Sequence, residues 1–261
     1  MNTAFDGSAN GAPVVNAPPA KQGVSGSLAT DTITVLSCET GTAVKTFDGN
    51  NVYPYSAGRL FRNMELPCAS LAELHKTLVL IEKWSDAFVI RGEPLDRSKA
   101  NLPMLRRASG TRATFREVPR HWLMLDIDNV IAPAGIDPVS VDAIEHVVGL
   151  LPSEFKGVSY ISQWSGSAGM KPGRIKLHLW YWLEEALGSP ELRAWAKGLA
   201  LLPTGRRLID PAPFSVVQPH YTARPLCCGG DDPIPHRMRF VALPKDAVRL
   251  EVKKPHAESV N

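Results

Sequence analysis

Cysteine is scarce in this sequence: the chain has four, and none of them belongs to a CxxC pair. Such spacing gives no zinc signature and no sign of a disulfide framework, which fits a reducing compartment. Two histidines lie near the cysteine pair, but His220, Cys227, Cys228 and His236 match no ordinary zinc spacing, so zinc is not expected. Long apolar runs are also missing. None approaches the roughly 18 residues of a membrane span.

The first residues lack a basic region followed by an apolar one, so no signal peptide is expected. These absences together predict a cytoplasmic protein without a membrane partner. The chain also has no GxxxxGK[ST] loop, the phosphate-binding signature of helicase motors.

The chain also lacks a large excess of charge of one sign, because its net charge is only +3. Its distribution is uneven. The stretch from Arg91 to Arg120 holds eight basic and three acidic residues, a local charge of +5. A basic segment that leads into acidic residues favours a polyanionic substrate. The alternative is a solvated basic loop.

Hydrophobic residues make up 44% of the 261 residues, enough for a substantial core. Residues 1–29 are rich in Gly, Ala, Asn and Pro and predict a disordered lead-in. Residues 30–250 are expected to form the folded part of the chain, and residues 251–261 a flexible tail.

Hydrophobic periodicity predicts three helices and a larger number of strands. The helices are expected at 70–84, capped by Ser70 with Glu73, at 137–150, capped by Asp137, and at 190–201, capped by Ser189. The strands are expected at 33–36, 43–47 (the two forming a hairpin), 87–90, 121–128, 158–162, 175–183, 206–210 and 238–243. Alternating polarity in the strongest strands favours an antiparallel or mixed sheet with one solvated face. The fold class is therefore α+β, with a cleft on the exposed sheet face.

The stretch HWLMLDID at 121–128 ends in two acids spaced two apart. Side chains of a strand alternate between faces, so Asp126 and Asp128 share one face while Leu125 and Ile127 share the other. Two carboxylates held side by side are costly unless a cation or a proton separates them. A divalent metal with oxygen ligands is one interpretation. The other is a strand that runs into an acidic turn at Asp128–Asn129.

Two further strands carry polar groups that suit such a site. The strand IKLHLWYWL at 175–183 places Lys176 and His178 on one face, and the strand RRLID ends at Asp210. Gathered on one sheet face, these groups would hold divalent ions and a phosphate-rich substrate. Alternatives remain open: Asp210 precedes a proline and suits a turn, and His178 alone suits a surface histidine.

The ordered motifs LMLDID (123–128), KLHLW (176–180) and RLID (207–210) resemble the three-motif signature of the archaeo-eukaryotic primase superfamily. Segments such as VIRG (89–92), SQWSGSAG (162–169) and DPIPHRMRF (232–240) are similar to primase domains of bacterial plasmids, phages and integrated mobile elements. The resemblance covers residues 71–243. It implies a primase-type catalytic core with an RRM-like mixed or antiparallel sheet packed against helices, in which residues 30–250 form a catalytic domain of two interleaved α/β subdomains.

The resemblance also implies roles for individual residues. Asp126, Asp128 and Asp210 match the ligands of a two-metal Mg²⁺ or Mn²⁺ site, and His178 matches the catalytic histidine that contacts the nucleotide phosphates. Lys176 stands where the family usually has a small residue, which leaves open whether it binds phosphate. Further nucleotide contacts are expected from Ser162, Ser165, Ser167, Arg224, Arg237 and Arg239, and template contacts from Arg91, Arg106 and Arg107.

The function implied is that of a DNA primase or primase-polymerase in the replication of a mobile element. Such a nucleotidyltransferase binds a single-stranded DNA template and NTPs or dNTPs. Because the chain has no helicase loop, any DNA unwinding is expected from a helicase on another chain, or from a part missing here. Two other classes stay open. Three acids and a histidine also suit a metal-dependent nuclease, and the same fold without catalysis suits a replication-initiator module that binds DNA.

Overall fold

The computed structural model describes residues 31–49, 51–56 and 58–252. The lead-in predicted for residues 1–29 lies outside the described residues, as does the predicted tail from residue 253 onward. The described residues form three α-helices: α1 (Leu71–Ile81), α2 (Val141–Leu150) and α3 (Ser189–Gly198). Single turns of 3₁₀-helix lie at η1 (Arg97–Lys99), η2 (Ser153–Phe155) and η3 (Ala212–Phe214).

The strands of the first half are β1 (Asp31–Cys38), β2 (Thr46–Asp48), β3 (Asn51–Tyr53), β4 (Leu60–Cys68), β5 (Ala87–Ile90), β6 (Glu93–Pro94), β7 (Met104–Leu105) and β8 (Phe115–Arg116). Those of the second half are β9 (Arg120–Ile131), β10 (Tyr160–Trp164), β11 (Arg174–Leu187), β12 (Leu226–Cys228) and β13 (Met238–Val241). Separate helices and antiparallel sheets confirm the α+β class.

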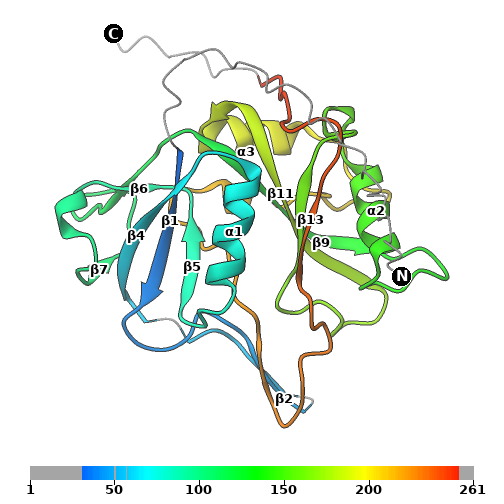
Figure 1. Cartoon of the computed structure of the whole chain (residues 1–261), viewed down its shortest axis with the longest axis horizontal. Coiled ribbons are helices and arrows are strands. Elements are labelled where there is room, and N and C mark those ends of the chain that lie inside the picture. Colours follow the sequence, from blue (N-terminus) through cyan, green and yellow to red (C-terminus); the bar gives the residue numbers. More distant parts are fainter. Residues whose placement is uncertain (1–30, 50, 57, 253–261) are drawn as a thin grey trace, which may run out of the picture.

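Two four-stranded antiparallel sheets form the body, in the orders β5-β1-β4-β7 and β13-β10-β11-β9. Figure 1 shows them on either side of α1. The apolar stripe of α1 packs into one cluster with β1 of the first sheet and with Ile161 and Trp180 of the second. The helix therefore joins the inner faces of both sheets, and Trp180 is buried beside it.

The second sheet follows the element order β9–α2–β10–β11–α3–β13. Its strand order places the hairpin β10–β11 in the centre, whereas the central strands of an RRM are its first and third. The antiparallel sheet packed against helices is thus present, but with a strand order that is not that of an RRM. The outer face of the sheet forms the largest core with α2 and α3, through residues such as Leu125, Ala143 and Leu192.

Helices cover both faces of the second sheet, so the expectation of one solvated face is wrong. The alternation in β9 and β11 has a different cause. Their inner faces carry Trp122 and Trp180 in the cluster that contains α1, and Asp126, Asp128 and His178 at the end where the space between the sheets opens. The cleft lies at this opening.

Helix starts follow the predicted caps only in part. Ser70 Oγ accepts the Glu73 amide of α1, and the Glu73 carboxylate accepts the Ala69 amide at 2.8 Å, which confirms the predicted capping pair. The caps predicted for the other two helices are wrong. Ser140 caps α2, because Asp137 closes a preceding turn by accepting the Val139 amide. Helix α3 already includes Ser189, and Gly188 is its cap.

The predicted hairpin of the first two strands is also wrong. β1 pairs with β4 and β5, while β2 pairs with β3 and, in parallel, with β12. This small three-stranded sheet, which we name the lobe, projects from the body near the opening between the sheets (Figure 1). The apolar strand β1 takes a central place in the first sheet because its side chains are buried there. Its pairing partners lie far away in the sequence, so no local pattern predicts this place. Within the described residues, no helix is long and apolar enough to cross a membrane.

Candidate active site

Strand β9 presents its two acids as the alternation predicts. Leu123, Leu125 and Ile127 lie in the outer core, and Asp126 and Asp128 line a pocket on the opposite face. A register shift separates the pairs Val130–Ile175 and Ile127–Leu177, so Asp128 and Asn129 together oppose one residue of β11. This bulge is a local irregularity that re-aims side chains. It returns Val130 to the core and leaves Asp128 at the mouth of the pocket.

Asp210 reaches the same pocket from a distant part of the chain. Its backbone amide donates a hydrogen bond of 3.1 Å to the Asp126 carbonyl, and the Asn129 side chain donates to the Arg207 carbonyl at 3.2 Å. Residues 207–210 therefore run antiparallel along the outer edge of β9. The predicted strand 206–210 is wrong as a regular strand, since the segment bonds to β9 at isolated points and forms no continuous ladder. The Asp210 carboxylate also accepts the Ala212 amide, so it caps the following turn as well.

His178 lies on β11 directly opposite Asp126. The Gln163 amide donates to the Thr222 carbonyl at 2.7 Å, and its oxygen accepts the Trp180 indole N–H at 3.0 Å. The same oxygen lies 3.4 Å from Nδ1 of His178, so that nitrogen must carry the proton of the neutral ring. Its Nε2 is then a bare acceptor, 3.7 Å from the Asp126 carboxylate. Burial lowers the pKa of His178 to about 4, which keeps the ring neutral at pH 7.

Asp126 is the carboxylate most affected by its surroundings. Burial, then repulsion from Asp128 and from Asp210, raises its pKa to about 7. Lys176 offsets part of this repulsion through an ion pair with Asp128, at 3.0 Å between Nζ and Oδ1. The charge in the pocket is therefore not balanced by the protein, and a proton or a cation at Asp126 would relieve it.

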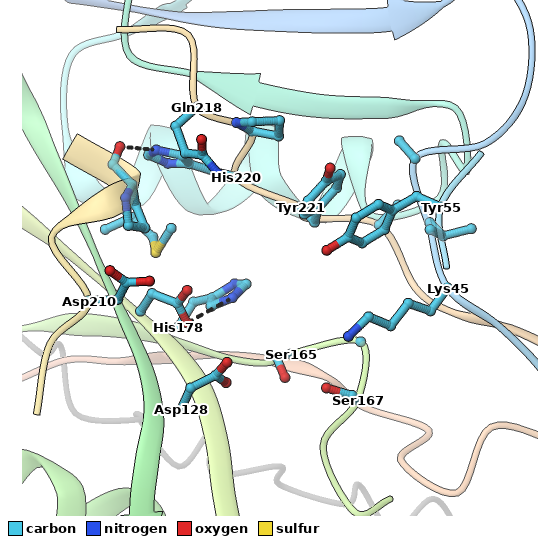
Figure 2. A pocket seen from close by; sticks show the side chains of 18 of the residues that line it. Lys45, Tyr55, Asp128, Ser165, Ser167, His178, Asp210, Gln218, His220 and Tyr221 are labelled. Atoms are coloured by element: carbon cyan, nitrogen blue, oxygen red, sulfur yellow. Dashed lines mark hydrogen bonds and ion pairs between the residues drawn. The ribbon is translucent and has the colours of Figure 1, made fainter. Parts of the chain in front are cut away.

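The donors at this position fit a divalent cation. Asp126, Asp128 and Asp210 line one pocket, and Nε2 of His178 faces the Asp126 carboxylate. Figure 2 shows Asp128, Asp210 and His178 at this side of the pocket. Oxygen ligands suit Mg²⁺ or Mn²⁺. Yet the described part of the chain contains no group of three His, Cys, Asp or Glu side chains already drawn together as a metal site. The three acids share the pocket without closing on a common point.

The far wall of the pocket includes three residues that sequence reasoning missed, Lys45, Tyr55 and Gln218. Lys45 and Tyr55 extend from the lobe and its loops, and Gln218, His220 and Tyr221 come from the segment after η3 (Figure 2). His220 donates from Nε2 to the Pro213 carbonyl at 2.7 Å, and its buried Nδ1 has no partner within the described residues. No motif marks these residues, because each is a single side chain in an irregular segment.

The serines of the Gly/Ser segment divide between two places. Ser165 and Ser167 line the pocket beside Asp128, where the sequence predicted hydroxyl groups. Ser162 does not: it lies in the middle of β10, opposite Leu179, and lines a separate hollow near α2 on the other face of the sheet. A residue on that face has no path to the phosphates of a substrate at the acids.

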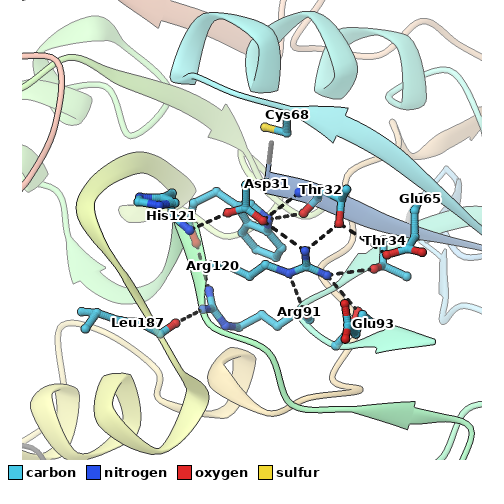
Figure 3. Close-up of polar contacts among 12 residues, drawn as sticks. Asp31, Thr32, Thr34, Glu65, Cys68, Arg91, Glu93, Arg120, His121 and Leu187 are labelled. Atoms are coloured by element: carbon cyan, nitrogen blue, oxygen red, sulfur yellow. Dashed lines mark hydrogen bonds and ion pairs between the residues drawn. The ribbon is translucent and has the colours of Figure 1, made fainter. Parts of the chain in front are cut away.

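Two of the three predicted template arginines are built into the fold. Arg91 is fully buried, donates to the carbonyls of Trp122 and Leu187, and lies over the Trp122 ring (Figure 3). Arg106 donates to the Val217 carbonyl and lies over the rings of Phe61 and Phe88. These contacts hold the two sheets and the returning segment together. Only Arg107 of the three is exposed.

The arginines predicted to contact the nucleotide lie outside the pocket. Arg237 is buried, pairs with Asp232 at 2.6 Å, and donates to the Ser165 carbonyl at 2.7 Å, so it holds the Gly/Ser loop rather than facing a ligand. Arg239 is exposed beside the hollow that Ser162 lines. Arg224 pairs with the buried Glu82, which lies at the C-terminal end of α1.

No family model matches the chain, and comparisons with curated proteins and with solved structures also find no match. The function proposed below therefore depends on the geometry and chemistry of the pocket, together with the resemblance of the motifs.

Proposed function

We propose that the protein is a DNA-dependent nucleotidyltransferase, a primase or primase-polymerase with a primase-type core that serves the replication of a mobile element such as a plasmid. The observation that carries the proposal is the hydrogen bond from the Asp210 amide to the Asp126 carbonyl. It brings the acid of the third motif to the strand of the first, and His178 of the second motif faces the same carboxylate.

Asp126, Asp128 and Asp210 would hold Mg²⁺ or Mn²⁺ in this proposal. When bound, the ions activate the attacking 3′-hydroxyl and stabilise the departing pyrophosphate. His178 offers a lone pair to the pocket, Ser165 and Ser167 offer hydroxyls, and Lys45 supplies a positive charge to the phosphates. A single-stranded DNA template and NTPs or dNTPs are the substrates, and a helicase on a separate chain is a proposed partner.

A metal-dependent nuclease is the second candidate, because the same acids and histidine suit hydrolysis. The ammonium of Lys45 and the hydroxyls of Ser165 and Ser167 favour a triphosphate as the substrate. Hydrolysis of a nucleic-acid chain does not need groups that bind a triphosphate. The two functions separate in one assay. With single-stranded template, labelled NTPs or dNTPs and Mn²⁺, a nucleotidyltransferase makes labelled oligonucleotides. Shortening of the template without synthesis would contradict the proposal and support the nuclease.

A further inference from the structure

The two loops that carry Lys45 and Tyr55 are fastened to each other. The Ser56 amide donates to the Thr42 carbonyl at 3.1 Å, and the Ser56 hydroxyl accepts the Thr42 amide at 3.2 Å. Gly41 has a φ of +83°, and a Cβ there would collide with the Ser56 carbonyl. Glycine is therefore required for this close approach. The loops hold Lys45 and Tyr55 in fixed positions at the pocket.

Tyr55 is the exposed end of an aromatic column. Its ring stacks on Tyr221 with centroids 4.0 Å apart and an interplanar angle of 18°. Tyr221 contacts Phe88, and Phe88 contacts Phe61 in the core of the first sheet. The Tyr55 side of this column lines the pocket, and the residue is 38% exposed. A planar ring could extend such a column, because aromatic faces stack in offset geometry.

Lys45 directs its ammonium group into the same pocket, toward the side that carries Ser165 and Ser167 (Figure 2). It makes no ion pair with any of the described residues. Burial and the neighbouring Lys176 lower the pKa of its ammonium, and the attraction of Asp128 and Asp126 offsets only part of this effect. The Ser165 hydroxyl is likewise buried without a partner in the described chain. The ammonium of Lys45 and the unpaired hydroxyl of Ser165 suit the binding of a phosphate group.

We propose that Lys45 and Tyr55 form the nucleotide-holding wall of the pocket, in which Lys45 binds the phosphates of a nucleoside triphosphate and Tyr55 stacks on its nucleoside end. The inference rests on the proposed nucleotidyl transfer and names the residues that bind its nucleotide substrate. It assigns nucleotide recognition to the two loops that carry Lys45 and Tyr55 rather than to Arg224, Arg237 and Arg239.

Binding without catalysis tests this wall. Isothermal titration calorimetry of the full chain with ATP, dATP and inorganic tripolyphosphate, each with Mg²⁺ and without template, separates the two contacts. Lys45→Ala should weaken all three ligands by about tenfold or more, because charge-assisted bonds are lost. Tyr55→Ala should weaken ATP and dATP by about fivefold or more and leave tripolyphosphate unchanged, since only a nucleoside stacks.

Matched controls lie in exposed positions away from the pocket. Tyr53→Ala removes an exposed tyrosine of the same lobe, and Lys156→Ala removes an exposed lysine after η2. Neither should change any affinity. Tyr55→Phe should keep nucleotide affinity, and Tyr55→Leu replaces Tyr55→Ala if the latter does not fold. The inference is overturned if the wild type binds none of the three ligands, if Lys45→Ala binds tripolyphosphate normally, or if the folded variant without a ring binds ATP and dATP within twofold of wild type.

The result is independent of primer synthesis. If the wild type makes primers and the Lys45 and Tyr55 variants bind nucleotide normally, the proposed function is supported and the nucleotide-holding role of Lys45 and Tyr55 is contradicted. If nucleotide binding follows the pattern above but no primers are made, the role of Lys45 and Tyr55 is supported and the proposed function is contradicted.

Discussion

The Asp210 amide and the Asp126 carbonyl form a backbone hydrogen bond of 3.1 Å, which ties the segment before η3 to the acidic strand. Backbone atoms make this bond, so it survives substitution of either side chain. The position of the Asp210 carboxylate is thus set independently of its charge. Variants at the two acids can therefore test chemistry without moving the segment.

The first prediction concerns this pair. Asp210→Asn and Asp126→Asn should each abolish primer synthesis, because neutral amides are poor ligands for a divalent cation. Asp210→Asn keeps an oxygen for the Ala212 amide, so the melting temperature should stay close to that of wild type. Template-directed synthesis and thermal unfolding measure the two effects.

Asp246→Asn, in an exposed segment far along the chain, is the matched control and should retain synthesis. Full synthesis by a folded Asp210→Asn protein would remove Asp210 from the site.

The second prediction concerns pH. The pKa of Asp126 in the folded protein, about 7, lies above its ordinary value of 3.8, so the folded state binds this proton more tightly than the unfolded state. Its contribution to the free energy of unfolding is therefore full at low pH and is lost as pH rises from about 4 to about 7. With about 1.4 kcal/mol per pKa unit, the loss amounts to a few kcal/mol at most.

Urea unfolding in EDTA at several pH values, compared between wild type and Asp126→Asn, isolates this group from the other titrating residues. The stability of wild type relative to the variant should fall across that range, and Mg²⁺ should reduce the fall. Parallel stability curves for the two proteins would show that Asp126 is not perturbed.

The third prediction concerns Lys176. Its ammonium occupies one oxygen of Asp128, so Lys176→Ser should free that oxygen and lower the Mg²⁺ or Mn²⁺ concentration for half-maximal synthesis severalfold. Synthesis itself should be retained. Metal titrations of the primer assay measure the change. A folded Lys176→Ser protein without activity would instead show that the lysine contacts the substrate.

The fourth prediction concerns Gln163, whose amide joins Trp180, His178 and the Thr222 carbonyl. Gln163→Leu leaves these buried groups unpaired and should lower the free energy of unfolding by about 1–3 kcal/mol. In wild type, ¹⁵N chemical shifts of His178 should report a proton on Nδ1 at pH 7. A proton on Nε2 in that spectrum would contradict the network.

The fifth prediction separates Arg91 from Arg107. Arg91→Ala removes a buried side chain with two carbonyl partners and a ring contact, so it should destabilise the protein by about 3 kcal/mol. Arg107→Ala, at an exposed position, should leave stability unchanged. If Arg107 serves the template, its loss should weaken single-stranded DNA binding and reduce the salt dependence of that binding. Unchanged DNA affinity in Arg107→Ala would remove the last of the predicted template arginines.

The sequence alone determined the local features of this protein. Side chains of a strand alternate with period two, so the faces of β9 and β11 could be predicted residue by residue. Helical spacing and the Ser70–Glu73 pair likewise predicted α1 and its start. These features depend on neighbours within a few residues, which periodicity and propensity record.

Tertiary structure decided what meets the acidic strand. Asp210 lies beside Asp126 because an irregular segment bonds to the edge of β9, and Lys45 and Tyr55 reach the pocket because Gly41 lets two loops approach closely. Burial likewise decided the arginines: Arg91 and Arg237 satisfy carbonyls in the interior, although their charge predicts a surface role. Contacts between distant segments leave no periodic trace in a single sequence, because packing of the whole chain selects them.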